Sequence, residues 1–485
     1  MSQKKILKKL MKFMFSLSLI QPVFGNTVDL IINKENIDDF IHHTLPNASI
    51  GILLQDAHTG NILYEKQSDE PFPPASTTKL FTGAASLLAL GTDYQYKTVI
   101  KIETTNLRQG ILKGDLYIQF SGDPSLSIDD LTKLLHEIKL GDIKQIDGNI
   151  VIDNTRFQEP MYAMGWSHES LNWFFAAPIT TVILNQNLIP MNINSNKPIG
   201  EKAEISFHPN EIIKTDLTQN VTTVTEEEAA SRCQINVSMN DENHIFMSGC
   251  WPQKQSPSTL KISVKNPNLL AKQIILKTLV SEKIGFSGKI LFGKTPTDLT
   301  IIASHSSKPF HELLKTMLQD SNNLYAESFT KTLGSEFFHK GTFQMGVVAI
   351  KETLSKSMLL NLDTLSLFDG SGLSRYNMAT PRQFASLLYT MYNHKRFSKV
   401  FMGSLPVSGE NGTLKGWMTS KRLQGHVYAK TGFLMNHSIL AGYLIMPSKK
   451  DLIFVIMVDH VLDINLAKRF EKGLCELFLD CKGDT

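Results

Sequence analysis

The feature that most limits the possible folds is a change of pattern in the middle of the chain. Residues 98–302 contain short alternating segments separated by Gly, Pro, Asn and Asp, which is typical of strands and turns. Helical patterns return from about His311, and strand patterns lie near both ends of the chain. We therefore expect one α/β core, formed by residues 26–97 and 303–485. The β-rich block at 98–302 would be inserted into it and divided into two subdomains. The length of 485 residues fits this reading, because it exceeds what one hydrophobic core usually supports.

Local patterns predict the main elements of the expected core. Alternation predicts a hairpin, and spacing of three and four residues predicts helices, the last of which we expect to pack on the core sheet rather than lie on lipid. The predicted elements are a helix at 35–45, a hairpin at 49–55 and 61–66, a buried helix from near Ser76 to Gly91, helices in the segments HELLKTMLQD, NLYAESFTKTLG and PRQFASLLYTMYN, strands in HVYAKTG, SILAGYLIM and DLIFVIMVD, and an amphipathic helix from about Leu462 to Leu479.

The first 25 residues have the pattern of a secretory signal peptide. Five lysines precede an apolar run at 13–24, and the small residue Gly25 offers a cleavage site. An uncleaved anchor is the alternative, although this run is short for a transmembrane helix, and no other run reaches that length. Removing the segment leaves 44 basic and 46 acidic residues, so the formal charge changes from +3 to −2. A nucleic-acid partner therefore loses its compositional support. We expect an exported protein, with loose membrane association left open.

Export affects how the four cysteines are interpreted, because an oxidising compartment favours disulfides. The simplest pairings are Cys233 with Cys250 and Cys475 with Cys481, although four cysteines allow three connectivities. Metal binding is the weaker alternative. The 14 histidines include no H-E-x-x-H run, and no C-x-x-C pair occurs. We predict neither a metal nor a cofactor.

A possible nucleophile lies in the segment Ser76-Thr77-Thr78-Lys79. A serine needs an adjacent base, and a lysine three residues later on a helix lies on the same face. The helix N-terminus also presents free N–H groups to developing negative charge. The same spacing occurs at Ser2 and at Ser258, but the first lies in the leader and the second in a strand pattern, where residues three apart point to opposite faces.

Two further short motifs follow in the chain. Ser321-Asn322-Asn323 lies between two helical segments, where a hydroxyl and a carboxamide can be held toward a cleft. Lys430-Thr431-Gly432 ends a predicted strand and combines a cation, a hydroxyl and a bare backbone at which an extended substrate could pair. Taken alone, each motif is more typical of a cap or a turn.

In this order, Ser-x-x-Lys, Ser-x-N and Lys-Thr-Gly form the constellation of penicillin-binding proteins and serine β-lactamases. The chain resembles the low-molecular-mass class C penicillin-binding proteins, the D-alanyl-D-alanine carboxypeptidase and endopeptidase family S13. The resemblance extends over most of the mature chain, through the segments PASTTKLFTGAASLLALG, SGDPSL, IDGNIVID, SNNLYAE, DGSGLSRYN, LPVSGENGTL, AKTG and LAGYL. It implies a transpeptidase or serine β-lactamase-like core, an antiparallel sheet flanked by helices, with extra domains between the first two motifs.

The resemblance also implies a role for each motif. Ser76 would attack the carbonyl between the terminal D-alanines of a peptidoglycan stem peptide, and Lys79, its pKa lowered by partial burial and by Lys430, would accept the proton. The other implied roles are proton relay by Ser321, positioning of Lys79 or the substrate by Asn323, carboxylate binding by Lys430 and Thr431 beside Gly432, and an oxyanion hole from the backbone N–H groups of Ser76 and Phe433. Stem peptides and β-lactams would be the ligands, and the location would be periplasmic.

Phe433 is the main departure, because the family usually has a small hydroxyl residue after Lys-Thr-Gly. Its ring would narrow the cleft or favour another end of the stem peptide. Asn436 and His437 also replace smaller or apolar residues. Asp369, in the segment DGSGLSR, is expected to satisfy backbone groups of a turn, so we leave it out of the site.

Three functions are therefore compared. The first is a DD-carboxypeptidase or endopeptidase that forms an acyl-enzyme. The second is a β-lactamase-like hydrolase, for which the sequence offers no obvious carboxylate base to activate the deacylating water. The third is a wall-binding scaffold that keeps the fold without activity, which the intact motifs disfavour.

Overall fold

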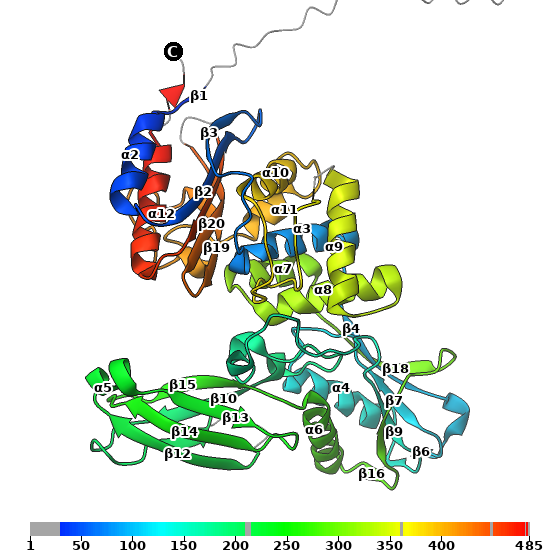
Figure 1. Ribbon diagram of the computed structural model, residues 1–485. Coiled ribbons are helices and arrows are strands. Elements are labelled where there is room, and N and C mark those ends of the chain that lie inside the picture. Colours follow the sequence, from blue (N-terminus) through cyan, green and yellow to red (C-terminus); the bar gives the residue numbers. More distant parts are fainter. Residues whose placement is uncertain (1–29, 209–214, 359–361, 447–449, 481, 484–485) are drawn as a thin grey trace, which may run out of the picture.

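The computed structural model describes residues 30–208, 215–358, 362–446, 450–480 and 482–483. The predicted leader at 1–25 lies outside the described residues. Figure 1 shows an upper body, which holds both ends of the described chain, and a lower part formed by the middle of the sequence.

An antiparallel five-stranded sheet is the centre of the upper body. Its strands lie in the order β19 (Val427–Leu434), β20 (His437–Leu444), β21 (Leu452–Asp459), β2 (Ser49–Asp56) and β3 (Ile62–Lys66). The predicted hairpin near the N-terminus is confirmed, and its first strand pairs with the last long strand, with Ser49 opposite Asp459. β19 is an edge strand. Both faces of the sheet are covered, which explains why β21 is a nearly continuous apolar run.

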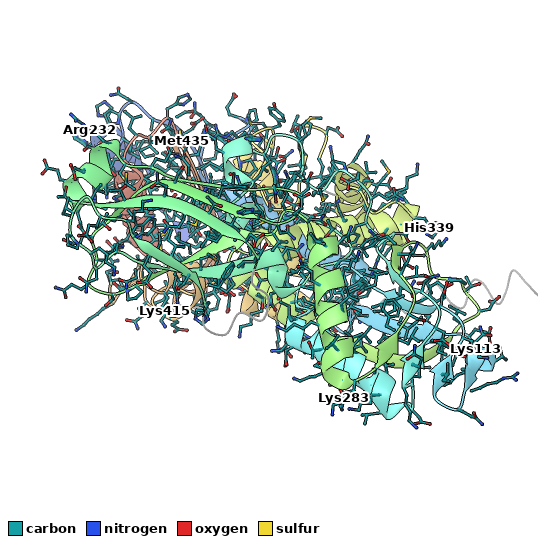
Figure 2. The ribbon with its side chains drawn as sticks, turned by 90° about the horizontal axis from the view of Figure 1, so that it is seen from below. Lys113, Arg232, Lys283, His339, Lys415 and Met435 are labelled. Carbon is teal, nitrogen blue, oxygen red and sulfur yellow. A yellow bond between two sulfur atoms is a disulfide. The ribbon has the colours of Figure 1, made fainter. Side chains whose placement is uncertain are left out.

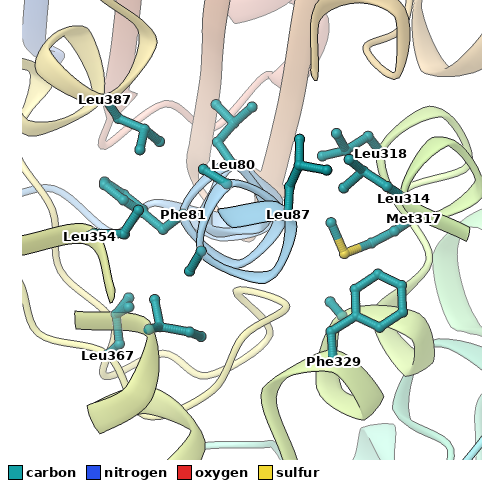
Figure 3. Close-up of a cluster of buried hydrophobic side chains, with 14 of the residues drawn as sticks. Leu80, Phe81, Leu87, Leu314, Met317, Leu318, Phe329, Leu354, Leu367 and Leu387 are labelled. Atoms are coloured by element: carbon teal, nitrogen blue, oxygen red, sulfur yellow. The ribbon is translucent and has the colours of Figure 1, made fainter. Parts of the chain in front are cut away.

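Helices cover the two faces of this sheet. On one face, side chains of alternate strand residues pack with α3 (Lys79–Leu90), α7 (Phe310–Gln319), α8 (Asn323–Phe338), α9 (Phe343–Met358) and α10 (Pro381–Tyr392). Figure 3 shows α3 at the middle of this cluster, surrounded by side chains of neighbouring helices such as Leu314, Leu354 and Leu387. The other face packs against α2 (Lys34–Thr44) and α12 (Ile464–Phe478). The expected fold class, an antiparallel sheet flanked by helices as in penicillin-binding proteins, is confirmed, as is the packing of the last helix on the sheet.

The chain leaves this body at β4 (Lys97–Ile102) and returns at β18 (Thr300–Ser306), and these two strands pair with each other. They belong to a five-stranded sheet with β7 (Leu116–Gln119), β9 (Ile150–Asp153) and β17 (Ile290–Phe292). A small sheet beside it contains β5 (Leu107–Arg108), β6 (Ile111–Leu112), β8 (Gln145–Ile146) and β16 (Gly285–Phe286). Most buried apolar residues between β4 and β18 form a hydrophobic cluster of their own, although a few, such as Phe157 and Ile179, pack with the upper body.

Two further three-stranded sheets form the left-hand green lobe of Figure 1. One contains β11 (Glu204–Phe207), β10 (Leu188–Asn194) and β15 (Ser258–Ser263). The other contains β12 (Leu217–Val224), β14 (Ile245–Pro252) and β13 (Ile235–Met239). The residue limits of the predicted subdomains stay a prediction.

The inserted block also contains two long helices that the strand-like pattern did not predict. α4 (Ile128–Leu140) begins with a capping box in which Ser127 and Asp130 satisfy each other's backbone N–H groups. α6 (Pro267–Glu282) begins with Asn266 as its cap and proline at the first position. These helix caps are local sequence signals, but the strand-like alternation of the surrounding segments led to a prediction of strands throughout the block.

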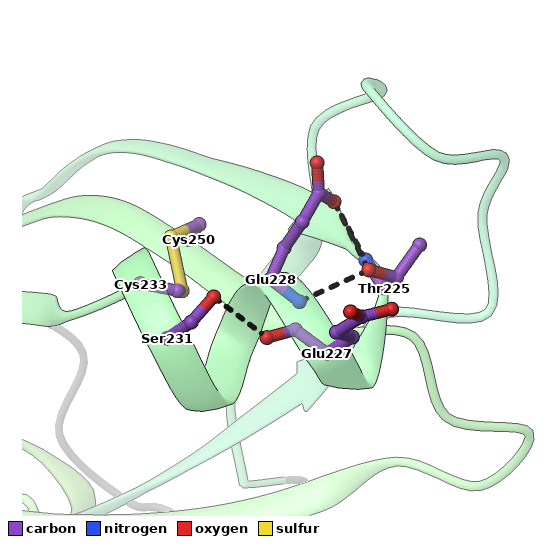
Figure 4. The surroundings of a disulfide bond; sticks show 6 residues. All are labelled: Thr225, Glu227, Glu228, Ser231, Cys233 and Cys250. Atoms are coloured by element: carbon purple, nitrogen blue, oxygen red, sulfur yellow. Dashed lines mark hydrogen bonds between the residues drawn. A yellow bond between two sulfur atoms is a disulfide. The ribbon is translucent and has the colours of Figure 1, made fainter.

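The cysteines agree with the prediction in part. Cys233 and Cys250 form a disulfide that ties the end of the short helix α5 (Glu226–Arg232) to β14 (Figure 4). Cys475 is a free, fully buried thiol on the inner face of α12. The predicted bridge between Cys475 and Cys481 is therefore wrong. Cys481 lies outside the described residues. No helix in the described ranges is long and apolar enough to cross a membrane.

Candidate active site

The predicted nucleophile lies on a tight turn rather than in the α-helix proper. Residues Ala75–Thr78 form a 3₁₀ turn that continues directly into α3. Because side chains three residues apart eclipse each other in a 3₁₀ helix, Ser76 and Lys79 are brought together, and the Lys79 Nζ lies 3.0 Å from the Ser76 Oγ. The preceding residue, Ala75, has a φ of +47°, a conformation that costs a non-glycine residue roughly 1–3 kcal/mol and that the surroundings must hold in place.

Lys79 is fully buried, although the sequence suggested only partial burial. Its Nζ donates to the Ser76 Oγ, to the Asn323 Oδ1 at 2.7 Å and to the Ser371 carbonyl oxygen at 2.7 Å. Burial lowers the pKa of Lys79 to about 7, against the opposing effect of Glu327 and Asp369. The neutral amine that a base requires is therefore accessible near neutral pH. Of the two expected causes, burial and Lys430, burial is the main one.

The second motif lies at the junction of α7 and α8. Ser321 has a φ of +56° and its Oγ accepts a hydrogen bond of 2.9 Å from the Lys430 Nζ. Asn322 caps α8 by accepting from the Tyr325 N–H. Asn323 is the first residue of that helix. Besides binding Lys79, its Nδ2 donates to the Phe175 carbonyl oxygen at 2.7 Å, so a segment of the inserted block holds the orientation of its amide.

The third motif lies on β19, an edge strand of the catalytic sheet. The strand does not end at Gly432, as predicted, but runs two residues further to Leu434. At its start, a neighbouring segment covers the edge: the Ala429 N–H donates to Pro406 and the Val427 carbonyl accepts from Ser408. Because edge-facing groups recur every second residue, the backbone groups of Thr431 and Phe433 face the same edge beyond that cover.

Lys430 and Gly432 face the nucleophile from this strand. Lys430 is fully buried, and its Nζ donates to the Ser321 Oγ and to the Thr431 carbonyl oxygen. Burial and the nearby Lys79 hold the pKa of Lys430 well below its usual value. A side chain at Gly432 would place its Cβ 2.9 Å from the Pro74 carbonyl oxygen and 3.2 Å from the Ser76 nitrogen, so glycine allows the strand to approach the turn closely.

Thr431 and Phe433 lie on the other side of the strand. The Thr431 Oγ1 is 2.9 Å from the Thr413 Oγ1. The Phe433 ring is 37% exposed and contacts the Trp417 ring, with a centroid distance of 6.2 Å, while the Lys468 Nζ lies 4.7 Å above the ring centroid. The ring thus lies beside Thr431 at the rim of the site.

Sequence reasoning missed two groups that hold Lys79. The Ser371 carbonyl accepts from its Nζ, and the fully buried Glu327 fixes that segment by accepting from the Gly370 and Ser371 N–H groups at 2.9 and 2.8 Å. Burial and Asp369 raise the pKa of Glu327 to about 8. An acidic residue one helical turn after Asn323, on the same face of the predicted helix, was the available signal.

Asp369 takes the structural role expected of it. Its carboxylate accepts from the Gly372 and Ser374 N–H groups and from the side chains of Asn377 and Trp166. Across the described ranges, no group of three or more His, Cys, Asp or Glu side chains could hold a metal ion.

Comparisons with known proteins agree with this geometry. Residues 33–478 match the D-Ala-D-Ala carboxypeptidase 3 (S13) family. The chain is 29% identical over 451 residues to D-alanyl-D-alanine carboxypeptidase DacB of Haemophilus influenzae, covering 92% of this chain and 91% of that protein. It is 30% identical over 431 residues to a D-alanyl-D-alanine carboxypeptidase of an Actinomadura species, covering 85% and 78%.

Solved structures extend the similarity to the fold. The crystal structure of penicillin binding protein 4 (dacB) from Haemophilus influenzae superposes with a TM-score of 0.84 at 29% identity, covering 92% of this chain and 99% of that one. A second structure of that protein, complexed with a β-lactam, gives a TM-score of 0.79 at 28% identity, with the same coverage of both chains.

Proposed function

The chain belongs to the D-Ala-D-Ala carboxypeptidase 3 (S13) family, and we propose that Ser76 is the nucleophile of its peptidase reaction. It is a serine-type D-Ala-D-Ala carboxypeptidase, a penicillin-binding peptidase that acts on peptidoglycan. The single observation that carries the assignment of Ser76 is its 3.0 Å contact with a fully buried lysine.

The three partners of the Lys79 Nζ support its role as the base. A neutral amine has two N–H groups and one lone pair. The Asn323 Oδ1 and the Ser371 carbonyl oxygen can accept hydrogen bonds but cannot donate them. Their contacts with the Lys79 Nζ therefore use both of its N–H groups. The lone pair then points to the remaining partner, the Ser76 hydroxyl. Lys79 takes the hydroxyl proton as the Ser76 Oγ bonds to the carbonyl carbon of the penultimate D-alanine.

The oxyanion of the tetrahedral intermediate is assigned to two backbone donors. The Ser76 N–H lies at the start of the nucleophile turn, and the Phe433 N–H faces the sheet edge next to it. Backbone donors are independent of side-chain type, so phenylalanine can fill this position. One such donor is worth about 3–4 kcal/mol of transition-state stabilisation in comparable enzymes.

Departure of the terminal D-alanine requires a proton at its nitrogen. Ser321 is placed to deliver it, because its hydroxyl is hydrogen-bonded to Lys430, whose pKa burial has lowered. The C–N bond breaks, the amine leaves protonated, and the acyl group stays on Ser76. Water then attacks the ester. We assign Thr431, with Lys430 behind it, to the terminal carboxylate of the substrate.

The predicted leader at 1–25 supports a periplasmic location, where stem peptides and β-lactams would reach the site. Endopeptidase activity on cross-linked peptides uses the same acyl-enzyme and is part of the proposal. Incubation with defined monomeric and cross-linked muropeptides, followed by mass analysis, measures the balance of the two activities.

Covalent labelling by a fluorescent penicillin tests the nucleophile. Ser76→Ala should abolish labelling, because no bond can form without the Oγ. Ser258→Ala is the matched control: it has the same Ser-x-x-Lys spacing but lies on β15 in the insertion, and it should label like the wild type. Labelling that survives in Ser76→Ala would refute the assignment. Rapid release of the label from the wild type would instead indicate a β-lactamase-like hydrolase.

A further inference from the structure

The rim of the site next to Thr431 contains a cation, Lys468, that packs against an aromatic ring. Lys468 lies on α12, and its Nζ is 4.7 Å from the centroid of the partly exposed Phe433 ring. Within the described part of the chain, no carboxylate lies within ion-pair distance of Lys468. The neighbouring Glu471 is fully buried and accepts a hydrogen bond from the Ser438 hydroxyl. Glu471 interacts electrostatically with Lys468, but burial raises the pKa of this carboxyl to about 8, so near neutral pH it is mostly uncharged and leaves the ammonium available to an anion.

The Phe433 ring that contacts this cation is held in place by its neighbours. The Phe433 ring is packed on one side by Trp417, from the loop that also supplies Thr413. Thr431 and Phe433 are two residues apart on β19, so their side chains lie on the same face of the strand. Lys468, Phe433 and Trp417, which we call the aromatic rim, therefore adjoin the hydroxyl assigned to the substrate carboxylate.

The buried lysine of the third motif is poorly placed to neutralise that carboxylate alone. The Lys430 Nζ is occupied by Ser321 and by the Thr431 carbonyl oxygen, and it is fully buried on the side of the strand that faces the nucleophile. A carboxylate at the sheet edge loses part of its hydration and needs a cation on its own side. Phe433 offers no hydroxyl there. Lys468 is a cation on the face of β19 that carries the side chains of Thr431 and Phe433.

We propose that Lys468, held over Phe433 beside Trp417, is a binding residue for the terminal carboxylate of the substrate. This chain thus recognises the free C-terminus with an ammonium from α12 in place of a hydroxyl at position 433. The proposal rests on the carboxypeptidase function and specifies how that site selects a substrate with a free carboxylate.

The test uses the full-length enzyme and two acylated tripeptides ending in D-Ala-D-Ala, one with a free carboxylate and one as its C-terminal amide. Lys468→Met should raise KM for the carboxylate peptide about fivefold to twentyfold, with kcat within about twofold, because it removes a charge-assisted contact made equally in the ground and transition states. It should not change kcat/KM for the amide. Release of D-alanine or D-alaninamide is measured by mass.

Three further variants separate charge from fold. Lys468→Arg keeps the cation and should keep KM within about threefold. Phe433→Leu keeps an apolar side chain but removes the ring that seats the ammonium, and should raise KM for the carboxylate peptide about threefold. Lys472→Met, one turn along the same helix, is the matched control and should leave KM unchanged. Thermal unfolding verifies that each variant is folded, and Lys468→Gln replaces the methionine variant if that one is not.

The outcomes distinguish this proposal from the function on which it rests. An unchanged KM for the carboxylate peptide in folded Lys468→Met or Lys468→Gln overturns the role of Lys468, as does an equal rise in Lys472→Met. Failure of the wild-type enzyme to release D-alanine from any peptide or to react with penicillin instead overturns the proposed function.

Discussion

The pH dependence of acylation tests the buried lysine base most directly. The perturbation is a change of pH between 5 and 9.5. In the free side chain the pKa is 10.5, and burial lowers that of Lys79 to about 7. This difference corresponds to roughly 5 kcal/mol against the charged form, or about a thousandfold more neutral amine at pH 7. Removal from water dominates, because the nearby Glu327 and Asp369 act in the opposite direction.

The expected profile follows from the fraction of Lys79 that is neutral. A group of pKa 7 is neutral in about 1% of molecules at pH 5, about 10% at pH 6 and about 90% at pH 8. The second-order rate of acylation by a fluorescent penicillin should therefore rise about tenfold per pH unit up to about pH 6.5 and level off above pH 8. Quenched reactions resolved on gels measure this rate at limiting penicillin.

Lys79→Arg is the control, because a guanidinium keeps the charge but does not deprotonate in a protein. It should acylate at a negligible rate at every pH. A wild-type profile that is flat between pH 5 and 8, or that has its midpoint near 10, would refute the reasoning. Circular dichroism at each pH separates a loss of base from a loss of fold.

Three further predictions concern other parts of the structure. Gly432→Ala should slow acylation at least tenfold and cost about 1–3 kcal/mol of stability, because the new Cβ presses on backbone atoms of the Ser76 turn. Gly416→Ala, whose Cβ meets no atom within 4 Å, should change neither, and equal rates in the two variants contradict this reasoning. Replacing both Cys233 and Cys250 by alanine should lower the stability of the inserted lobe by about 3 kcal/mol, which faster proteolysis of this lobe would detect. The rate of acylation should not change, and slower acylation would contradict this by showing that the lobe is coupled to the site. Burial raises the pKa of Glu471 from 4.5 to about 8, so between these pH values the folded state keeps a proton that the unfolded state releases. This carboxyl therefore makes the free energy of unfolding fall by up to about 1.4 kcal/mol per pH unit in that range. Glu471→Gln should remove this pH dependence, and a stability difference from the wild type that is the same at pH 5 and at pH 8 contradicts the prediction.

The elements that carry the motifs could be predicted because their signals are local. Helical spacing after Ser76 indicated α3, and alternation indicated the strand that carries Lys430. The order of the three motifs then identified the family, which the comparisons confirm. The rejection of the second Ser-x-x-Lys match was also correct, because Ser258 lies on β15.

The remaining features depend on contacts between distant segments, which no local pattern reveals. Full burial of Lys79 results from packing of α3 among helices that follow more than 200 residues later, and its third partner is a backbone carbonyl, which any residue type could supply. The spacing of Cys475 and Cys481 suggested a bridge, but amphipathic packing turns Cys475 into the core beneath the sheet. The ring contacts of Phe433 likewise come from α12 and the loop of Trp417, far apart in sequence.

The pairing of β2 with β21 has a consequence for how the enzyme is made. Ser49 lies opposite Asp459, so the centre of the catalytic sheet cannot close until almost the whole polypeptide has been synthesised. Non-local pairing of this kind slows folding. The inserted block, with its own hydrophobic cluster and with β4 paired to β18, can fold earlier. Its completion brings residues 97 and 306 side by side and shortens the loop that the sheet must still close. Folding of the insertion first would therefore lower the entropic cost of closing the catalytic sheet. The turn that carries Ser76 can meet β19 only after residues 427–434 have been synthesised.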